Sequence, residues 1–266
     1  MIQVKTDKEI TAIQRSSLYV SEIQSEVAKI LRAGMNTMEI EKFVERWFAD
    51  KKLIPSFKGY GGFPFCTCIS VNDTVVHGFP SEKIILKDGD IISIDIGVFY
   101  NGYHGDSAYS FHIGQPSAEL EKLSRTTKKS LFLGIEKAIA GNRVGDIAFA
   151  IEEHCSLQNG YGVVRELTGH GLGKKLHEEP NIPNYGKKGS GPLLPENCVI
   201  AIEPMINMGV KNIFVEDDNW TVKTKDGKPS AHFEHTICVK KNQALILSDF
   251  SIVEKAIVTN PNLFFI

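Results

Sequence analysis

The feature that most constrains the fold is a pattern that this sequence carries twice. Residues 86–95 and 194–203 each read as a turn, a short aliphatic run and then an acidic residue, Asp95 or Glu203. An aliphatic run bounded by turn residues is typical of a buried strand. A carboxylate at the end of such a strand is costly to desolvate unless it is paired, hydrogen-bonded or bound to a metal. The pattern therefore predicts a sheet with an acidic site at its strand ends.

A second similarity lies upstream of each of these runs. Ala-Gly occurs at 33–34 and at 140–141, and each pair is followed at the same distance by an isoleucine, Ile40 or Ile147. The two similarities together predict an internal repeat in which each half is a helix pair followed by strands. We expect the halves to share one core, because each is small on its own.

Local signals predict where helices and strands begin. Thr6 with Glu9, and Asn36 with Glu39, have the spacing of capping boxes that open helices. Asn-Gly at 101–102, between two strand-like runs, is a strong hairpin signal. Strands are predicted at 68–71, 91–98, 107–112, 199–202 and 233–239. Helices combined with mainly antiparallel strands indicate an α+β fold.

The domain organisation follows from the absence of any low-complexity linker in the sequence. We expect a single domain over residues 1–248, with internal halves of about 1–115 and 116–248. Residues 249–266 then form a C-terminal extension rich in apolar residues. We expect this extension to pack on the body, and the sequence suggests no function for it.

Composition and charge exclude several classes of function. The net charge is −2 with no block of like charges, which argues against a nucleic-acid or anionic-membrane partner. No apolar run approaches the ~18 residues of a membrane helix. The 5 cysteines are scattered and odd in number, which indicates a reducing compartment rather than a disulfide framework. We therefore expect a cytoplasmic protein that binds neither DNA nor a membrane, and a monomer as its default state.

Four acids and one histidine supply the candidate chemistry. Asp95 and Glu203 end strands, Glu234 interrupts an apolar run, and His170 lies between two glycines that let a bulky group approach the backbone. Taken singly, each acid is more simply a solvated or ion-paired residue, and His170 a packed core histidine. With Asp106 they form an oxygen-rich set with one nitrogen donor. Such a set suits two divalent ions (Co, Mn, Fe, Zn or Ni) that activate a shared water.

Five ordered motifs carry a resemblance to a known family. They are residues 72–80, 95–97 with 103–107, 169–173, 202–205 and 233–236. Over about residues 3–248 the sequence resembles type I methionine aminopeptidases in their short bacterial form. The resemblance implies the pita-bread fold, two α+β halves related by a pseudo-twofold axis. It also implies hydrolysis of the initiator methionine from peptides and nascent proteins by a water that two metal ions activate.

The same resemblance implies roles for the metal-binding residues. Asp95 would hold one metal ion, and His170 and Glu203 the other. Asp106 and Glu234 would bridge both ions. Glu203 is also the implied general base, a group that contributes ~100- to 10,000-fold in rate when it is within hydrogen-bond reach.

Two further histidines and a pocket complete the implied site. His177 would hydrogen-bond the scissile carbonyl, and His77 would lie near the amide of the leaving peptide. The pocket for the methionine side chain would be lined by Tyr60, Phe63, Cys68, His77, Leu176 and Trp220. Leu176 departs from the family, which more often has an aromatic residue there, so the shape of the pocket stays open. Without the family, residues 59–64 would read as a glycine-rich turn with core aromatics.

Three alternatives and several properties also stay open. A prolidase-like relative would cleave X-Pro bonds, although such proteins usually carry a large extra N-terminal domain. A non-catalytic pita-bread protein is expected to have lost metal ligands. A helical di-iron protein needs Glu-x-x-His pairs, which this sequence lacks. The physiological metal, the residue tolerated after methionine and a transient contact with the ribosome are not decided by the sequence.

Overall fold

The computed structural model describes all residues 1–266, and its centre is a long hairpin. Strands β4 (Ile91–Tyr100) and β5 (Tyr103–Ile113) are antiparallel over their whole length. Between them Asn101 and Gly102 both have positive φ, 50° and 85°, as a tight two-residue hairpin turn requires. The predicted hairpin is confirmed, and both strands extend beyond their predicted bounds.

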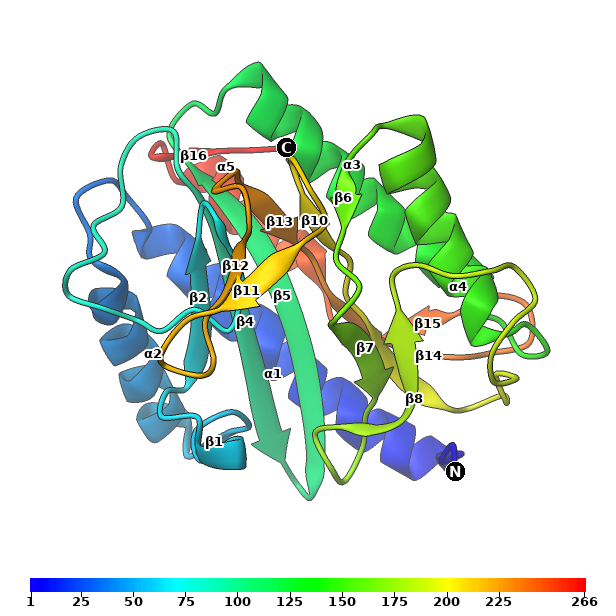
Figure 1. Cartoon of the computed structure of the whole chain (residues 1–266). Helices are drawn as coiled ribbons and strands as arrows, with labels where there is room; N and C mark the ends of the chain where they lie inside the picture. The colour runs from blue at the N-terminus through cyan, green and yellow to red at the C-terminus, as the bar shows by residue number, and fades with distance from the viewer.

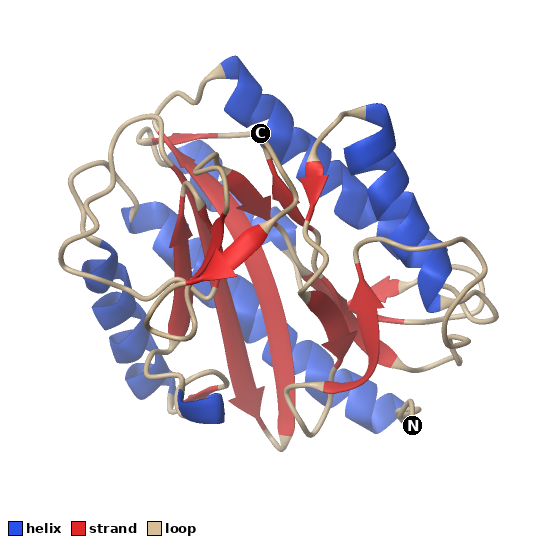
Figure 2. Cartoon of the chain, in the orientation of Figure 1, coloured by secondary structure: helices blue, strands red, loops and turns tan.

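Two five-stranded antiparallel sheets lie side by side, with helices along their back and sides (Figures 1 and 2). In the first sheet, β1 (Ile54–Pro55) and β2 (Thr67–Val71) pair with β4, and β16 (Leu263–Phe264) pairs with β5. The second sheet has the order β15-β14-β9-β7-β8. Its strands are β7 (Thr168–Gly171), β8 (Glu178–Pro183), β9 (Val199–Ile202), β14 (His235–Cys238) and β15 (Leu245–Ile246).

Two small three-stranded sheets, β13-β10-β6 and β11-β12-β3, complete the strand structure. Their members are β3 (Thr74–Val76), β6 (Gly162–Val163), β10 (Met205–Asn207), β11 (Ile213–Val215), β12 (Val222–Thr224) and β13 (Ser230–His232). Because every strand pair of the four sheets is antiparallel, the predicted α+β class with mainly antiparallel strands is confirmed.

The helices begin where the capping signals predicted. Thr6 and Asn36 each accept a hydrogen bond from the backbone N–H of a glutamate three residues on, and that glutamate accepts one from the cap. These capping boxes open α1 and α2. The helices are α1 (Asp7–Ile30), α2 (Thr37–Lys51), α3 (Ala118–Lys137), α4 (Val144–Glu152) and α5 (Phe250–Thr259), with a short 3₁₀ turn η1 (Tyr60–Gly62) and a π-helical turn η2 (Glu153–Gln158). No helix is long and apolar enough to cross a membrane.

One predicted strand is wrong in its boundary. The segment 233–239 was expected to be continuous, but β14 begins only at His235, and Phe233 and Glu234 lie in a break after β13. At this break the chain leaves the small sheet, where β13 pairs with β10, and enters the second large sheet. The reason is tertiary: the backbone N–H of Glu234 donates to the carbonyl of Ala108 on β5 instead of continuing a ladder.

The C-terminal segment packs on the first half of the molecule. Helix α5 lies against α1, and β16 pairs with β5 at the edge of the first sheet. The side-chain amide of Asn260 donates to the carbonyls of Ala28 and Leu31, which lie at the end of α1. These carbonyls would otherwise be among the unsatisfied groups of a helix terminus.

Candidate metal centre

A cavity of about 260 Å³ lies between the two large sheets. All the residues that sequence reasoning selected for the site line it: Tyr60, Phe63, Cys68, His77, Asp95, Asp106, His170, Leu176, His177, Glu203, Trp220 and Glu234. Residues that sequence reasoning missed also line it: Phe57, Val76, Glu166, Leu167, Thr168 and Met205. The structure therefore brings every predicted site residue to one place, although they come from segments far apart in the chain.

The two aspartates lie on one face of the central hairpin. Asp95 on β4 is opposite Ala108, and Asp106 on β5 is opposite Gly97. The two acids are therefore diagonal neighbours across the strand pair, within reach of each other on the same side of the sheet. Their spacing follows from the register of a continuous hairpin.

The two glutamates lie at strand ends in the second half. Glu203 directly follows β9, and Glu234 directly precedes β14. Because Ile202 is opposite His235 in this antiparallel pair, the next residues along, Glu203 and Glu234, leave the ladder at the same point. The side-chain amide of Asn184 donates to the backbone carbonyl of Glu203 at 2.9 Å and holds the chain there.

Hydrogen bonds join the two halves directly behind the acids. The Thr236 hydroxyl donates to the backbone carbonyl of Asp106 at 2.7 Å and accepts from its N–H at 3.3 Å. The Ser107 hydroxyl donates to the carbonyl of Glu234 at 2.7 Å. Each half therefore fixes the backbone of an acid that belongs to the other half.

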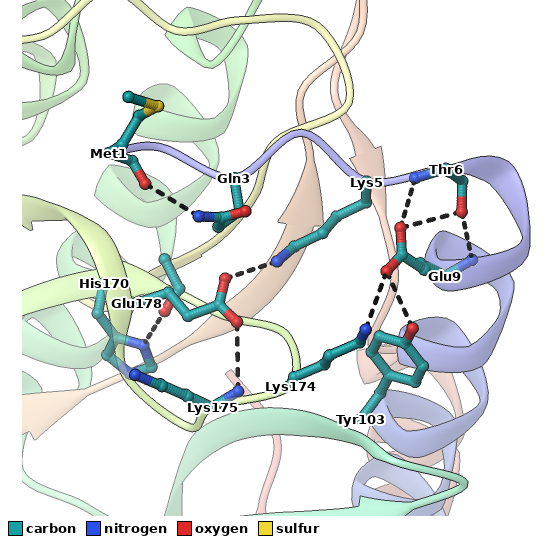
Figure 3. Close-up of polar contacts among 11 residues, drawn as sticks. Met1, Gln3, Lys5, Thr6, Glu9, Tyr103, His170, Lys174, Lys175 and Glu178 are labelled. Carbon is teal, nitrogen blue, oxygen red and sulfur yellow. Dashed lines mark hydrogen bonds and ion pairs between the residues drawn. The ribbon is translucent and has the colours of Figure 1, made fainter.

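His170 on β7 presents its imidazole to the acids. Its Nδ1 donates to the carbonyl of Gly171 at 2.9 Å, a contact drawn in Figure 3. That bond leaves Nε2 free as an electron-pair donor, the arrangement found in metal-binding histidines. Nε2 lies 3.9 Å from Asp106 Oδ2 and 3.7 Å from Glu203 Oε1. Ligand atoms of Asp106, His170 and Glu234 all lie within 4.8 Å of one another.

The electrostatics of the four acids favour a cation among them. Burial raises the pKa of Asp95 to about 7 and the pKa of Glu203 to about 8. Burial and then the neighbouring carboxylates raise the pKa values of Asp106 and Glu234 well above their usual range. Asp95 Oδ1, Asp106 Oδ1 and Glu234 Oε1 are buried and have no hydrogen-bond partner. Buried oxygens without partners are costly, and divalent ions would satisfy them. The residues fit a metal centre.

His177 and His77 lie at the wall of the same cavity. The ring of His177 packs 4.2 Å from that of His170, centroid to centroid, and its Nδ1 is hydrogen-bonded to the Tyr60 hydroxyl at 2.9 Å. His77 has a left-handed backbone with φ of 57°, which is uncommon outside glycine and is frequent at functional sites. Burial lowers the pKa of both imidazoles, that of His77 to about 4.

The segment that carries His177 is anchored by its neighbour. Glu178 forms an ion pair with Lys5, whose side chain is buried, and accepts a hydrogen bond from the backbone N–H of Lys175 at 3.2 Å. Figure 3 shows Lys5 reaching Glu178 from the strand-like start of the chain. The beginning of the chain therefore fixes the turn before β8, and with it the position of His177.

The remaining wall of the cavity is apolar. The rings of Phe63 and Trp220 meet edge to face at 5.1 Å, and Cys68 and Leu176 are buried and line the same cavity as the four acids. Burial raises the pKa of the Cys68 thiol well above its usual range, so it stays a neutral, polarizable group. This wall suits a slender apolar side chain.

Sequence reasoning missed one buried histidine next to these acids. His232 ends β13, is 1% exposed, and its Nε2 lies 3.6 Å from Glu203 Oε2. Burial lowers the pKa of His232. A signal was present in the sequence: His232 and Glu234 are two residues apart in an extended segment, and such residues share a face.

Comparison with known proteins identifies the family of the chain. The model of metallopeptidase family M24 matches residues 11–241. The methionine aminopeptidase of Clostridium acetobutylicum is 44% identical over 248 residues, which cover 93% of this chain and 99% of the relative. Methionine aminopeptidase 1 of Bacillus subtilis is also 44% identical, with the same coverage.

Solved structures give the same result. A crystal structure of methionine aminopeptidase from Thermotoga maritima has a TM-score of 0.91 and 39% identity, covering 94% of this chain and all of the other. X-Pro aminopeptidase from the same organism has a TM-score of 0.72 at 25% identity, and this chain covers 62% of it. The pita-bread fold is thereby confirmed. The chain belongs to the metallopeptidase family M24 and, within that family, to the type I methionine aminopeptidases.

Proposed function

We propose that this chain hydrolyses the peptide bond after an N-terminal methionine, with two divalent metal ions that would activate the attacking water. Membership of the family makes it a metal-dependent aminopeptidase. The observation that carries the finer proposal is the convergence of four acids and His170 beside an apolar pocket. A site of this kind combines a place for a charged reaction centre with a place for one apolar side chain.

The proposal assigns a metal-binding role to each of the five groups. Asp95 would hold one ion, His170 and Glu203 would hold the other, and Asp106 and Glu234 would be shared between the two. Bound divalent ions polarise a carbonyl and lower the pKa of a bound water so that it reacts at neutral pH. The ligand set alone does not select among Co, Mn, Fe, Zn and Ni, because first-row ions compete for such sites.

The remaining polar groups act on the substrate. Glu203 takes the proton of the attacking water as general base. His177 donates a hydrogen bond to the carbonyl oxygen where negative charge develops, and removing such a donor typically costs ~100- to 1000-fold in rate. His77 lies beside the amide nitrogen of the leaving peptide. The Tyr60 hydroxyl, 2.9 Å from His177 Nδ1, fixes the orientation of that imidazole.

The apolar wall receives the methionine side chain. A thioether makes favourable contacts with aromatic rings and with a soft thiol. The edge-to-face pair of Phe63 and Trp220 and the buried thiol of Cys68 provide these groups. Leu176 contributes an aliphatic surface in place of a ring and leaves this side of the pocket less rigid.

The wider setting is part of the same proposal. The substrates are peptides and nascent proteins with a free N-terminal methionine, which are made in the cytoplasm, so we place the enzyme there. We propose that the chain works as a monomer and meets the ribosome only transiently. A small residue after methionine is the preferred substrate sequence.

The test uses chelator-treated protein reloaded with Mn(II), Fe(II) or Co(II). We expect release of methionine from a Met-Ala-Ser peptide and none from its N-acetylated form, because the free amine is needed at the metal centre. Failure of every ion to restore cleavage would overturn the proposal.

The same assay separates the rival activity. Because the fold is shared with an X-Pro aminopeptidase, an Ala-Pro peptide is tested in parallel. Cleavage of Ala-Pro without cleavage of Met-Ala-Ser would assign the chain to the X-Pro class instead.

A further inference from the structure

The backbone of His232 is held by Ser110 on one side and by Met205 on the other. Its N–H donates to the Ser110 hydroxyl at 3.0 Å, and the same hydroxyl group donates to its carbonyl at 2.7 Å. In the small sheet it is opposite Met205, two residues after Glu203. The position of the imidazole is therefore set by both halves of the molecule.

The side chain of His232 makes its closest ionic contact with Glu203, and the Asp95 carboxylate also acts on its charge. Its Nε2 is buried without a hydrogen bond and lies 3.6 Å from Glu203 Oε2. The other oxygen of that carboxylate, Oε1, lies 3.7 Å from Nε2 of His170. Two imidazoles thus flank Glu203, one at each oxygen.

Two other buried histidines differ from His232 in what their side chains face. His112 on β5 is 1% exposed, and its Nε2 is hydrogen-bonded to the Ser124 hydroxyl at 2.9 Å, while its Nδ1 is buried without a partner and faces no acid of the cavity. His235 is 2% exposed, and its Nδ1 is hydrogen-bonded to the Ser248 hydroxyl at 2.6 Å. His232 has no such hydroxyl and instead faces an acid of the metal centre. A buried polar group in this position calls for a function.

We propose that His232 is a positioning residue for Glu203, donating a hydrogen bond from Nε2 to Oε2 so that Oε1 is directed to the ion shared with His170. The inference rests on the proposed metal centre. Carboxylates that bind metals are usually held by such a hydrogen bond, which selects one oxygen for the metal. A shift of the Glu203 carboxylate by a few tenths of an ångström shortens the distance of 3.6 Å between Nε2 and Oε2 to that of a hydrogen bond.

The test measures metal binding by the protein itself, with Mn(II) as the probe. Chelator-treated wild-type protein and variants are titrated by calorimetry, and folding is checked by circular dichroism. We expect His232→Ala to bind Mn(II) about 10- to 100-fold more weakly, the usual effect of losing such a partner. His232→Gln keeps an N–H donor of similar reach and should restore most of the affinity and of kcat.

A matched control removes a different buried imidazole. His112 lies on β5, on the strand that carries Asp106, but contacts Ser124 and not the cavity. We expect His112→Gln to leave the Mn(II) affinity unchanged, even if it lowers the melting temperature.

The outcomes are distinguishable. Equal Mn(II) affinity in wild type and His232→Ala overturns the inference. His232→Gln as weak as His232→Ala overturns it too, because the imidazole would then act as a metal ligand itself. Absence of Mn(II) binding in the wild-type protein counts against the proposed function instead.

Discussion

The two halves of the molecule supply the same number of acids to the site by different means. In the first half, Asp95 and Asp106 lie within the strands of one unbroken hairpin. In the second half, Glu203 and Glu234 lie where strands end and the chain passes between sheets. A short side chain is sufficient on a regular strand, whereas the longer glutamate reaches the site from a break.

The two aspartates and the two glutamates depend on different contacts. The register of β4 and β5 fixes the aspartates through local pairing and a two-residue turn, with one contact from the other half, between Thr236 and the backbone of Asp106. The glutamates depend on contacts between distant segments, such as Asn184 with Glu203 and Ser107 with Glu234. We therefore expect the second half to be the more sensitive to changes outside the site.

The largest expected effect comes from substituting the acids of the site. Glu203→Gln should lower kcat by about 100- to 10,000-fold and stay inactive with excess Mn(II), because the general base is lost. Asp95→Asn keeps the base, so most of its loss should be recovered with excess Mn(II). Initial rates on Met-Ala-Ser across a Mn(II) series measure both. Full recovery of Glu203→Gln by metal would contradict the assignment.

The next effect tests the bonds that join the halves. Thr236→Val removes two hydrogen bonds to the backbone of Asp106 and leaves its buried N–H and carbonyl unsatisfied. We expect a loss of about 1–3 kcal/mol in the free energy of unfolding, together with weaker Mn(II) binding. Urea denaturation and calorimetry measure these quantities. Thr127→Val in α3 is the control, since its hydroxyl only bonds within the helix. Equal Mn(II) affinity in both variants would show that the contact serves stability alone.

A smaller effect is the pH dependence of the metal-free protein. The pKa values of Asp95 and Glu203 are raised to about 7 and about 8 in the folded state. Above pH ~4.5 the unfolded chain has released these protons. The folded protein keeps these protons up to the raised pKa values, so these two groups lower the free energy of unfolding as pH rises from ~4.5 to 8, by about 2 kcal/mol between pH 6.5 and 8.

The buried histidines change the free energy of unfolding with pH in the opposite direction to the acids. Burial lowers the pKa of His170 to about 3, so below pH ~6.5 protonation favours the unfolded chain. Thermal unfolding of chelator-treated wild type, Asp95→Asn and Glu203→Gln between pH 6.5 and 8 isolates the two acids, because the histidines are the same in all three proteins. The curve of Asp95→Asn should fall less steeply than that of wild type below pH 7, and the curve of Glu203→Gln below pH 8. A variant curve parallel to the wild-type curve would contradict the raised pKa of the group that it lacks.

The smallest expected effect lies at the tip of the hairpin. Gly102 has φ of 85°, and a Cβ atom added to it would contact no other residue. Gly102→Ala therefore adds backbone strain without a clash. We expect a loss of about 1 kcal/mol in stability, with metal affinity and kcat unchanged. Equilibrium denaturation and Mn(II) titration test this. A loss of metal affinity as large as that of Thr236→Val would remove the contrast between local contacts of the hairpin and contacts that join the halves.

Local chemistry made several features predictable from the sequence. The capping boxes at Thr6 and Asn36, the Asn101-Gly102 turn and the aliphatic run before Glu203 each depend on neighbouring residues only. Asp95, Glu203 and Glu234 also stood out in the sequence, because an acid beside an apolar run is costly without a partner, and Asp106 and His170 joined them only through the pattern as a whole. Such features can be recognised from the sequence alone.

Tertiary structure alone decided how these parts meet. The break at Phe233-Glu234 arises because Glu234 bonds to β5, a strand far away in the sequence, and no local signal marks it. His232 lies beside Glu203 only in the folded structure, where the sheets that carry them come together. The physical reason is that hydrogen-bond partners across the seam, and the desolvation that shifts the acids, exist only after both halves have packed.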